Sequence, residues 1–350
     1  MKEKLQVLKK KMEEGVYNGV FPGATYAVII DGKTYTDYVG YRDLYPKKEK
    51  NTIDTLYDLA SLTKVIVTTI LIAQLIDEKK LTLNNRVCDY FQDFKHKDIT
   101  IYDLLTHSSG LPANIDWMQI TTKDDYIKLL FETEKIYETK SKSVYSDVGF
   151  IILGLIIEKI LNQPLDVIAT NKIFNVLGMK ETMYNPIDKN RCAATEKEND
   201  FYLKGIAHGK KTLLFDGMTG HAGLFSTISD MVKIAGMLLN DGKYLNKRVL
   251  SPNVFDSLFI PRIKDTNGFL RGLGFISGKN ELVGSYVSEK TIYHTGFTGT
   301  RFLVDYGNKI SFIILSNRIH PTRKNDKLKE FRKEVTDMVY ELFIVGETIK

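Results

Sequence analysis

The stretch YDLASLTKVIVTTI, residues 57–70, predicts the central helix of the fold. Residues 61–79 are apolar on nearly every side, which is typical of a helix that is buried on all faces. Ser61 and Lys64 lie in its first turn. Residues three apart share one helix face, so the Lys64 ammonium can reach the Ser61 hydroxyl.

Two explanations fit this Ser-x-x-Lys pair. The free N–H groups and positive dipole at a helix N-terminus favour developing negative charge, and burial lowers a lysine's pKa, so Ser61 with Lys64 suits an activated nucleophile. Alternatively, Ser61 caps the helix and Lys64 extends to solvent. A chain of this length contains such a spacing about once or twice by average composition, so the spacing alone leaves both explanations open.

Upstream of this stretch, the sequence predicts a helix and a hairpin. The N-terminus reads as a short amphipathic helix that carries Leu5, Leu8 and Met12. Residues 22–43 contain two β-rich runs around Asp-Gly-Lys at 31–33, which indicates two antiparallel strands joined by a tight turn.

Downstream, residues 80–200 are mostly helical with loops punctuated by Pro and Gly. Thr100 and Asp103 form a capping-box pattern, so a short helix is expected to begin there and to stop at Gly110. His107 in this segment has the chemistry of a base, but a histidine favoured by the dipole at a helix C-terminus is the preferred explanation.

The C-terminal part returns to strands. Residues 220–227 form a Gly-rich segment before a helix that we expect Ser229 or Asp230 to cap. Three β-rich segments and a final helix follow, at 268–277, 291–307, 309–317 and 323–345.

Strands at both ends of the chain, with helices between them, predict an α/β (α+β) fold. We expect one central antiparallel sheet flanked by helices, with a mostly helical inserted subdomain. The sheet domain takes residues 1–80 and 205–350 and the insert takes 81–204, within one unit overall.

Composition excludes several classes of function. The net charge of +6 is spread over basic stretches that alternate with acids, so we expect no nucleic-acid partner. The apolar runs are too short for a membrane span, and no signal peptide is recognisable, so the chain as given is expected to be cytoplasmic, or exported if it has been trimmed.

Cys88 and Cys192 are expected to be free thiols, and a single disulfide is the less favoured alternative. We expect no metal or cofactor, because no phosphate loop or metal-ligand spacing occurs. The oligomeric state stays open, with a monomer favoured.

Tyr145 precedes another very apolar helix, in the stretch SVYSDVGF. Its phenol could pass protons between the nucleophile, the leaving group and Lys64. The chain has 19 tyrosines, so a purely structural Tyr145 beside a capping Ser146 or Asp147 remains an alternative.

The stretch IYHTGFTGT places His294, Thr295 and Gly296 on an expected edge strand. Gly296 would let a substrate backbone approach closely. The N–H of Phe297 could complete an oxyanion hole with the N–H of Ser61. The alternative is a strand that ends in a Gly-rich turn.

In the order Ser-x-x-Lys, Tyr-x-Asp, His-Thr-Gly, these motifs resemble those of the serine β-lactamase and penicillin-binding-protein superfamily. The resemblance is strongest to its class C branch, which includes class C β-lactamases, D-Ala-D-Ala carboxypeptidases, D-aminopeptidases and related esterases. It covers nearly the whole chain, and a β-lactamase/transpeptidase-like fold is therefore expected.

The resemblance implies a role for each matching position. Ser61 would be the acylated nucleophile, Lys64 its base partner and Tyr145 the shared acid and base. The expected substrate contacts come from Asp147, His294, Thr295 and Gly296, and the oxyanion donors are the N–H groups of Ser61 and Phe297.

Two positions depart from the family's pattern. Asp147 stands where relatives often have Asn. An ionised Asp cannot donate a hydrogen bond to a substrate carbonyl. It could instead pair with Lys64, which would raise the pKa of Lys64 and favour Tyr145 as the base. His294 stands where β-lactamases have Lys, and a neutral imidazole anchors a carboxylate less well.

We therefore expect a serine hydrolase that works through an acyl-enzyme on a small ester, amide or D-amino-acid-containing substrate. A D-Ala-D-Ala carboxypeptidase or class C β-lactamase is the first alternative, and a non-catalytic ligand-binding member of the fold is the second. The partner is a small-molecule or peptide substrate.

Overall fold

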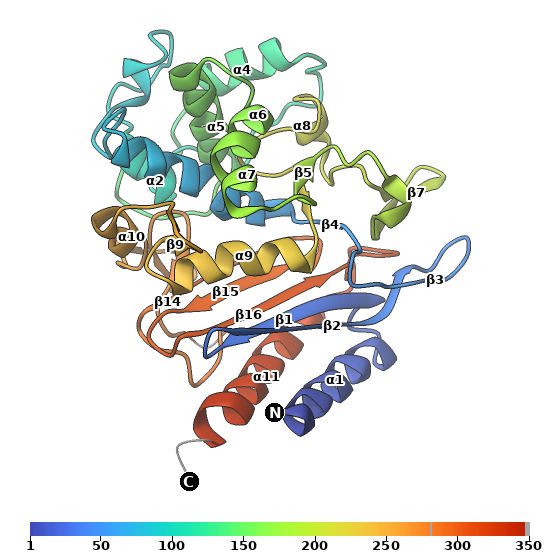
Figure 1. Cartoon of the computed structure of the whole chain (residues 1–350). Helices are drawn as coiled ribbons and strands as arrows, with labels where there is room; N and C mark the ends of the chain where they lie inside the picture. The colour runs from blue at the N-terminus through green and yellow to red at the C-terminus, as the bar shows by residue number, and fades with distance from the viewer. Residues whose placement is uncertain (281, 347–350) are drawn as a thin grey trace.

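The computed structural model describes residues 1–280 and 282–346, and a nine-stranded antiparallel sheet forms its centre (Figure 1). In spatial order the strands are β11 (Ile263–Lys264), β12 (Leu270–Arg271), β13 (Ile276–Ser277), β14 (Thr291–Thr295), β15 (Arg301–Asp305), β16 (Ile310–Ser316), β1 (Gly23–Ile30), β2 (Lys33–Asp43) and β3 (Glu49–Lys50). Because β1 pairs with β16, strands from both chain ends meet in the middle of the sheet, which confirms the predicted fold class.

Strand β1 shows why this sheet needs cover on both faces. Its alternate residues Tyr26 and Val28 pack in one hydrophobic cluster, whereas Ala27 and Ile29 pack in another. All eight residues of β1 are buried. The predicted hairpin is present, with positive φ at Asp31 and Gly32, as a two-residue hairpin turn requires.

Helices cover the two faces of the sheet, as Figure 1 shows. Helices α1 (Lys2–Tyr17) and α11 (Leu328–Tyr340) lie on one face, and α9 (Ile228–Leu239) lies on the other, below the remaining helices. Helix α11 begins five residues later than expected.

The expected cap of α9 was wrong. Thr227 occupies the cap position, and the carboxylate of Asp230 is turned away to accept the backbone N–H of Glu181. A long-range hydrogen bond has thus replaced the local one that the sequence pattern indicated.

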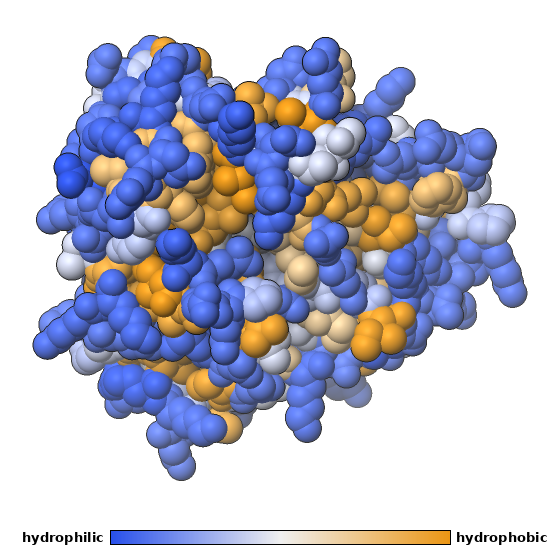
Figure 2. Space-filling view, turned by 90° about the horizontal axis from the view of Figure 1, so that it is seen from above, coloured by the Kyte–Doolittle hydropathy of each residue, from blue (hydrophilic) through white to orange (hydrophobic). Residues whose placement is uncertain are grey.

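The helical region lies on the α9 side of the sheet (Figure 1). Seen from above, apolar residues form a band across this side of the molecule between hydrophilic borders (Figure 2). The helices are α2 (Thr69–Asp77), α3 (Ile101–Leu105), α4 (Lys123–Glu132), α5 (Asp147–Leu161), α6 (Leu165–Ala169), α7 (Asn175–Leu177), α8 (Lys210–Leu213) and α10 (Pro252–Leu258). Three small sheets complete it. One has the three strands β4 (Tyr57–Asp58), β8 (Leu224–Ser226) and β5 (Met183–Tyr184), and the other two are the pairs β6 (Ala194–Glu198) with β7 (Phe201–Lys204) and β9 (Lys243–Tyr244) with β10 (Lys247–Arg248).

The short helix α3 confirms the capping box, because Thr100 and Asp103 exchange side-chain bonds to each other's backbone N–H. The expected stop at Gly110 was wrong: the helix ends at Leu105, and His107 already has a positive φ of 57°. Gly110 is needed further on, where a side chain would collide with the carbonyl of Tyr137.

The central helix is less regular than expected. It starts with a 3₁₀ turn at Ala60–Leu62, widens into a π-helical turn at Lys64–Thr68 and continues as α2. The 18 residues Ala60–Asp77 are long and apolar enough to cross a membrane by length and composition, but 83% of this segment is buried inside the protein. It forms part of the core.

Cys88 and Cys192 are free thiols in the structure. The division into a sheet domain (residues 1–80 and 205–350) and an insert (residues 81–204) stays a prediction. Residues 281 and 347–350 of the sheet domain lie outside the described residues. The monomeric state stays a prediction as well.

Candidate active site

Lys64 is fully buried and points at Ser61 rather than at solvent. Its ammonium donates to three acceptors: Ser61 Oγ at 3.2 Å, Asp147 Oδ1 at 2.8 Å and the carbonyl of His221 at 3.1 Å. An ammonium has three hydrogens, and each therefore has a partner. This geometry excludes a lysine that extends to water. It also excludes Ser61 as a helix cap, since its side chain makes no capping hydrogen bond.

The Asp147 carboxylate controls the charge of Lys64. Burial by itself would lower the pKa of Lys64, but the Asp147 carboxylate and Tyr145 outweigh burial and raise this pKa. Burial would likewise raise the pKa of Asp147, but the charges of Lys64 and Lys211 hold it well below its usual range. The two form an ion pair, so Lys64 is protonated near neutral pH and is not ready to act as a base.

Tyr145 lies between two cations. It ends the loop before α5, and the hydroxyl of the following Ser146 caps that helix. The Lys64 ammonium is 4.9 Å from the centre of the Tyr145 ring, and the Arg271 guanidinium is 5.3 Å from it. Tyr145 lines the cavity beside Ser61, whereas the ammonium of Lys64 is held in an ion pair with Asp147. Tyr145 is therefore better placed than Lys64 to receive a proton from Ser61.

His107 packs against Tyr145, with ring centres 4.8 Å apart. Its Nδ1 accepts the backbone N–H of Ser146, and burial lowers the pKa of the ring well below its usual value. His107 is thus neutral and structural. A structural role for His107 was expected and agrees with this geometry. The reason differs, because the bond from the Ser146 N–H holds the ring, rather than the dipole at the end of a helix.

His294 is also buried and neutral. It is 3% exposed, its Nδ1 lies 2.9 Å from the carbonyl of Thr295, and burial with the charges of Lys64 and Arg271 lowers the pKa well below its usual value. The expected edge strand was wrong, because β14 lies between β13 and β15. Its ladder with β13 reaches only Tyr293, so the end of β14 is unpaired on that side.

Gly296 is required by packing within the protein and not, as we expected, by the approach of a substrate backbone. A side chain here would collide with the carbonyl of Leu59 and the hydroxyl of Thr300, both parts of the protein itself. The glycine therefore allows the β14 end to pack against the segment before Ser61. Contact with substrate is not needed to explain it.

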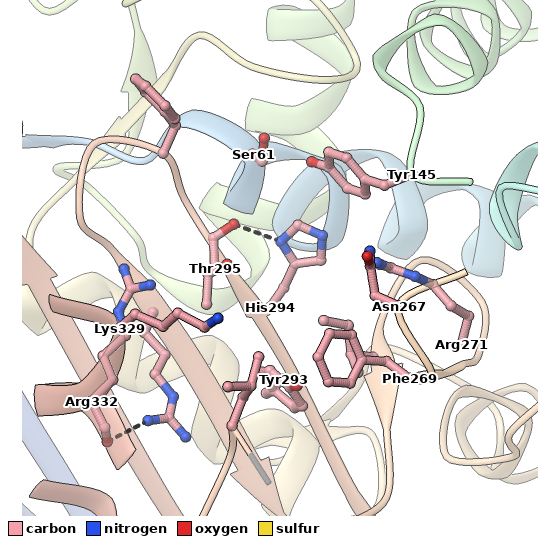
Figure 3. Close-up of a pocket in the computed structure, with 14 residues that line it drawn as sticks. Ser61, Tyr145, Asn267, Phe269, Arg271, Tyr293, His294, Thr295, Lys329 and Arg332 are labelled. Atoms are coloured by element: carbon pink, nitrogen blue, oxygen red, sulfur yellow. Dashed lines mark hydrogen bonds between the residues drawn. The ribbon is translucent and has the colours of Figure 1, made fainter. Parts of the chain in front are cut away.

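A cavity of about 440 Å³ opens beside these residues (Figure 3). Ser61, Tyr145, His294, Thr295 and Phe297 line it, which brings most of the sequence-predicted site together. Asp147 is not among its lining residues and reaches the site through Lys64. The oxyanion pair formed by the N–H groups of Ser61 and Phe297 stays a prediction.

The cavity wall carries positive charge that sequence reasoning missed. Arg271, Arg301, Lys329 and Arg332 line it, and its described lining residues include no Asp or Glu. In Figure 3 the Lys329 side chain reaches from α11 towards Thr295 and His294. These residues come from segments read only as strand or helix, with no local motif to mark them.

Lys211 was also missed. Its ammonium is 3.1 Å from Asp147 Oδ2, the oxygen that Lys64 does not use. It lies in a run of two lysines that resembles any solvated basic patch. Within residues 1–280 and 282–346, no group of three or more His, Cys, Asp or Glu side chains could hold a metal ion.

The comparison with protein families decides the relationship. The model of the family described as Beta-lactamase matches residues 8–337. The chain belongs to the beta-lactamase family. This member of the family carries the Ser-x-x-Lys, Tyr-x-Asp and His-Thr-Gly motifs at the positions described above.

Relatives of this beta-lactamase-family chain have several activities. It is 31% identical to an N-acetylmuramyl-L-alanine amidase from Bacillus subtilis (strain 168), with 91% of this chain and 82% of the relative covered. It is 32% identical to a putative D-alanyl-D-alanine carboxypeptidase from Salmonella gallinarum, with 79% and 72% covered. The solved structure of EstCE1, a hydrolase with promiscuous acyltransferase activity, matches with a TM-score of 0.80 at 19% identity, covering 96% of this chain and 98% of the other. The last match shows the shared fold alone.

Proposed function

We propose that this protein is a serine hydrolase that forms an acyl-enzyme on Ser61 and acts on a small ester, amide or D-amino-acid-containing substrate. The observation that carries the proposal is the buried Lys64, whose ammonium contacts both Ser61 Oγ and Asp147. Such an arrangement holds a serine beside a fixed positive charge, which stabilises the alkoxide that forms as its proton leaves.

The proposed reaction has two steps. Tyr145 takes the proton of Ser61 as Oγ attacks the substrate carbonyl, and the same proton then goes to the leaving amine or alcohol as its bond to carbon breaks. A water next attacks the ester carbonyl of the acyl-enzyme and gives a proton to Tyr145, which passes it to Ser61 Oγ as the bond to the acyl group breaks and the acid is released. Lys64 remains charged throughout.

Esterase or peptidase action ranks above hydrolysis of penicillins. The ionised Asp147 cannot donate a hydrogen bond to a substrate carbonyl, and the neutral His294 carries no charge for the carboxylate of a β-lactam. Amide bonds of cell-wall peptides are the favoured second candidate, because the amidase and the carboxypeptidase among its relatives are over 30% identical.

Turnover of a short-chain nitrophenyl ester beside a chromogenic cephalosporin, by wild type and Ser61→Ala, tests the proposal. We expect ester turnover that Ser61→Ala abolishes, and little cephalosporin turnover. N-acetylmuramyl-L-alanine and an acetylated D-alanyl-D-alanine peptide then separate the two amide classes. Hydrolysis that survives Ser61→Ala would make the assignment wrong, and failure of a serine-reactive phosphonate to label Ser61 would favour a ligand-binding member of the fold.

A further inference from the structure

Asp58, three residues before Ser61, is a buried carboxylate that pairs with no cation among the described residues. It is 2% exposed, and its two oxygens accept backbone N–H groups from Ala60 at 2.8 Å and His208 at 2.7 Å. Burial raises the pKa of this carboxyl. A carboxylate without an ion pair is costly to bury. Its presence at this position is explained if the two backbone N–H groups that it accepts need to be held in place.

One oxygen of Asp58 holds the backbone that leads into Ser61. Ala60 has a φ of +46°, in the left-handed region that residues other than glycine seldom adopt. Such strained conformations persist only where neighbouring contacts impose them. The bond from the Ala60 N–H to Asp58 Oδ1 is such a contact. Asp58 thus holds the strained residue that directly precedes Ser61.

The other contacts of Asp58 reach the segment that carries Phe297. The Thr298 hydroxyl donates to the Asp58 carbonyl at 2.6 Å. His208, whose N–H donates to the second carboxylate oxygen, stacks its ring on that of Phe297 with centres 5.1 Å apart. Asp58 therefore contacts Phe297's neighbour in sequence and its neighbour in space.

We propose that Asp58 is a positioning residue that sets the spacing between the Ser61 and Phe297 N–H groups of the oxyanion hole. This inference rests on the proposed acyl-enzyme function. Oxyanion donors act on the charge that develops in the transition state and barely on the bound substrate. A small misplacement of these donors therefore lowers kcat and leaves KM nearly unchanged.

The test compares Asp58→Asn with a matched control, Asp305→Asn. Asparagine keeps the size of the side chain but turns an amide N–H₂ towards one of the two N–H donors. Asp305 is also fully buried and accepts backbone N–H groups, from Ser288 at 2.9 Å and Asn308 at 3.0 Å. It pairs with the far end of β14, about 13 Å from the end near Ser61 by strand geometry.

We expect both variants to lose stability, but only Asp58→Asn to lose kcat, by about 10- to 100-fold with KM within about twofold. Its affinity for a boronic acid that mimics the tetrahedral intermediate should fall by a similar factor. Thr298→Val, which removes only the hydroxyl that donates to the main-chain carbonyl of Asp58, should cause a smaller kcat loss in the same direction. It tests the link between residue 58 and the Phe297 segment if Asp58→Asn does not fold.

Equal kcat losses in Asp58→Asn and Asp305→Asn, or a loss that resides in KM, would overturn the inference. Normal kcat in both Asp58→Asn and Thr298→Val alongside Ser61-dependent turnover would overturn it while leaving the proposed function intact. If wild type shows no Ser61-dependent turnover, the proposed function fails, and crystal structures of wild type and Asp58→Asn decide the positioning. An unchanged φ at Ala60 and an unmoved Phe297 segment would then reject it.

Discussion

Replacing Asp147 by Asn removes the only carboxylate that contacts the Lys64 ammonium among the described residues, at 2.8 Å from Nζ. Two unit charges at this separation attract by about 6 kcal/mol at an effective dielectric constant of about 20. The Asn oxygen keeps a hydrogen bond to the ammonium, and Asp147 is partly exposed and shared with Lys211, so the net loss is smaller. We expect a loss of about 3 kcal/mol, the lower end for a broken buried ion pair.

Urea unfolding at pH 7 measures this loss. The pKa of Asp147 is lowered in the folded protein, so its stabilisation is present above the ordinary carboxyl pKa and is lost as the pH falls through the folded value. The pKa of Lys64 is raised, so its stabilisation is present below the ordinary lysine pKa and is lost as the pH rises through the folded value. Lys211→Gln, which removes the outer partner only, is the control, with an expected loss of about 1 kcal/mol. A loss below about 1 kcal/mol for Asp147→Asn would refute the ion-pair argument.

The same variant tells which residue is the base. Removing the carboxylate lowers the pKa of Lys64. If the active enzyme needs a charged Lys64 and a basic Tyr145, the high-pH limb of kcat moves to lower pH. If neutral Lys64 is the base, the variant instead becomes relatively more active near pH 8. We expect the first result, and the second would return the base role to Lys64.

Three further predictions concern neighbouring groups. Tyr145→Phe should lower kcat at least about 100-fold, as loss of a general base does, whereas His107→Asn should lower it less than about tenfold; equal losses would mean that the acid and base are misplaced. Gly296→Ala should lower the unfolding free energy by at least about 2 kcal/mol, because its methyl group meets the carbonyl of Leu59, and unchanged urea unfolding would contradict this packing. Burial lowers the pKa of His221 to about 3, so the unfolded chain takes up a proton below pH 6.5 that the folded protein refuses. The unfolding free energy should therefore fall by about 2 kcal/mol between pH 7 and pH 5 because of His221. If a His221→Gln variant loses stability equally steeply over this range, His221 is not the cause.

The sequence determined features that depend on neighbours along the chain. The spacing of Ser61 and Lys64 brings their side chains to 3.2 Å even though the helix does not begin as a regular α-helix. Ser61 lies in a 3₁₀ turn, and three residues make one turn of a 3₁₀ helix. The hairpin at Asp31 and Gly32 and the cap at Thr100 are similarly local. The order of motifs along the chain was enough to indicate the family.

Features that join distant segments became visible in the folded structure alone. The ion pair between Lys64 and Asp147 was foreseen as one option, but its burial, which sets the lysine's charge, follows from packing around both groups. Gly296 was assigned to substrate, whereas the chain's own Leu59 carbonyl requires it. The bond from the His208 N–H to Asp58 spans 150 residues. No local pattern encodes such contacts, because they depend on how the folded chain brings buried polar groups to their partners.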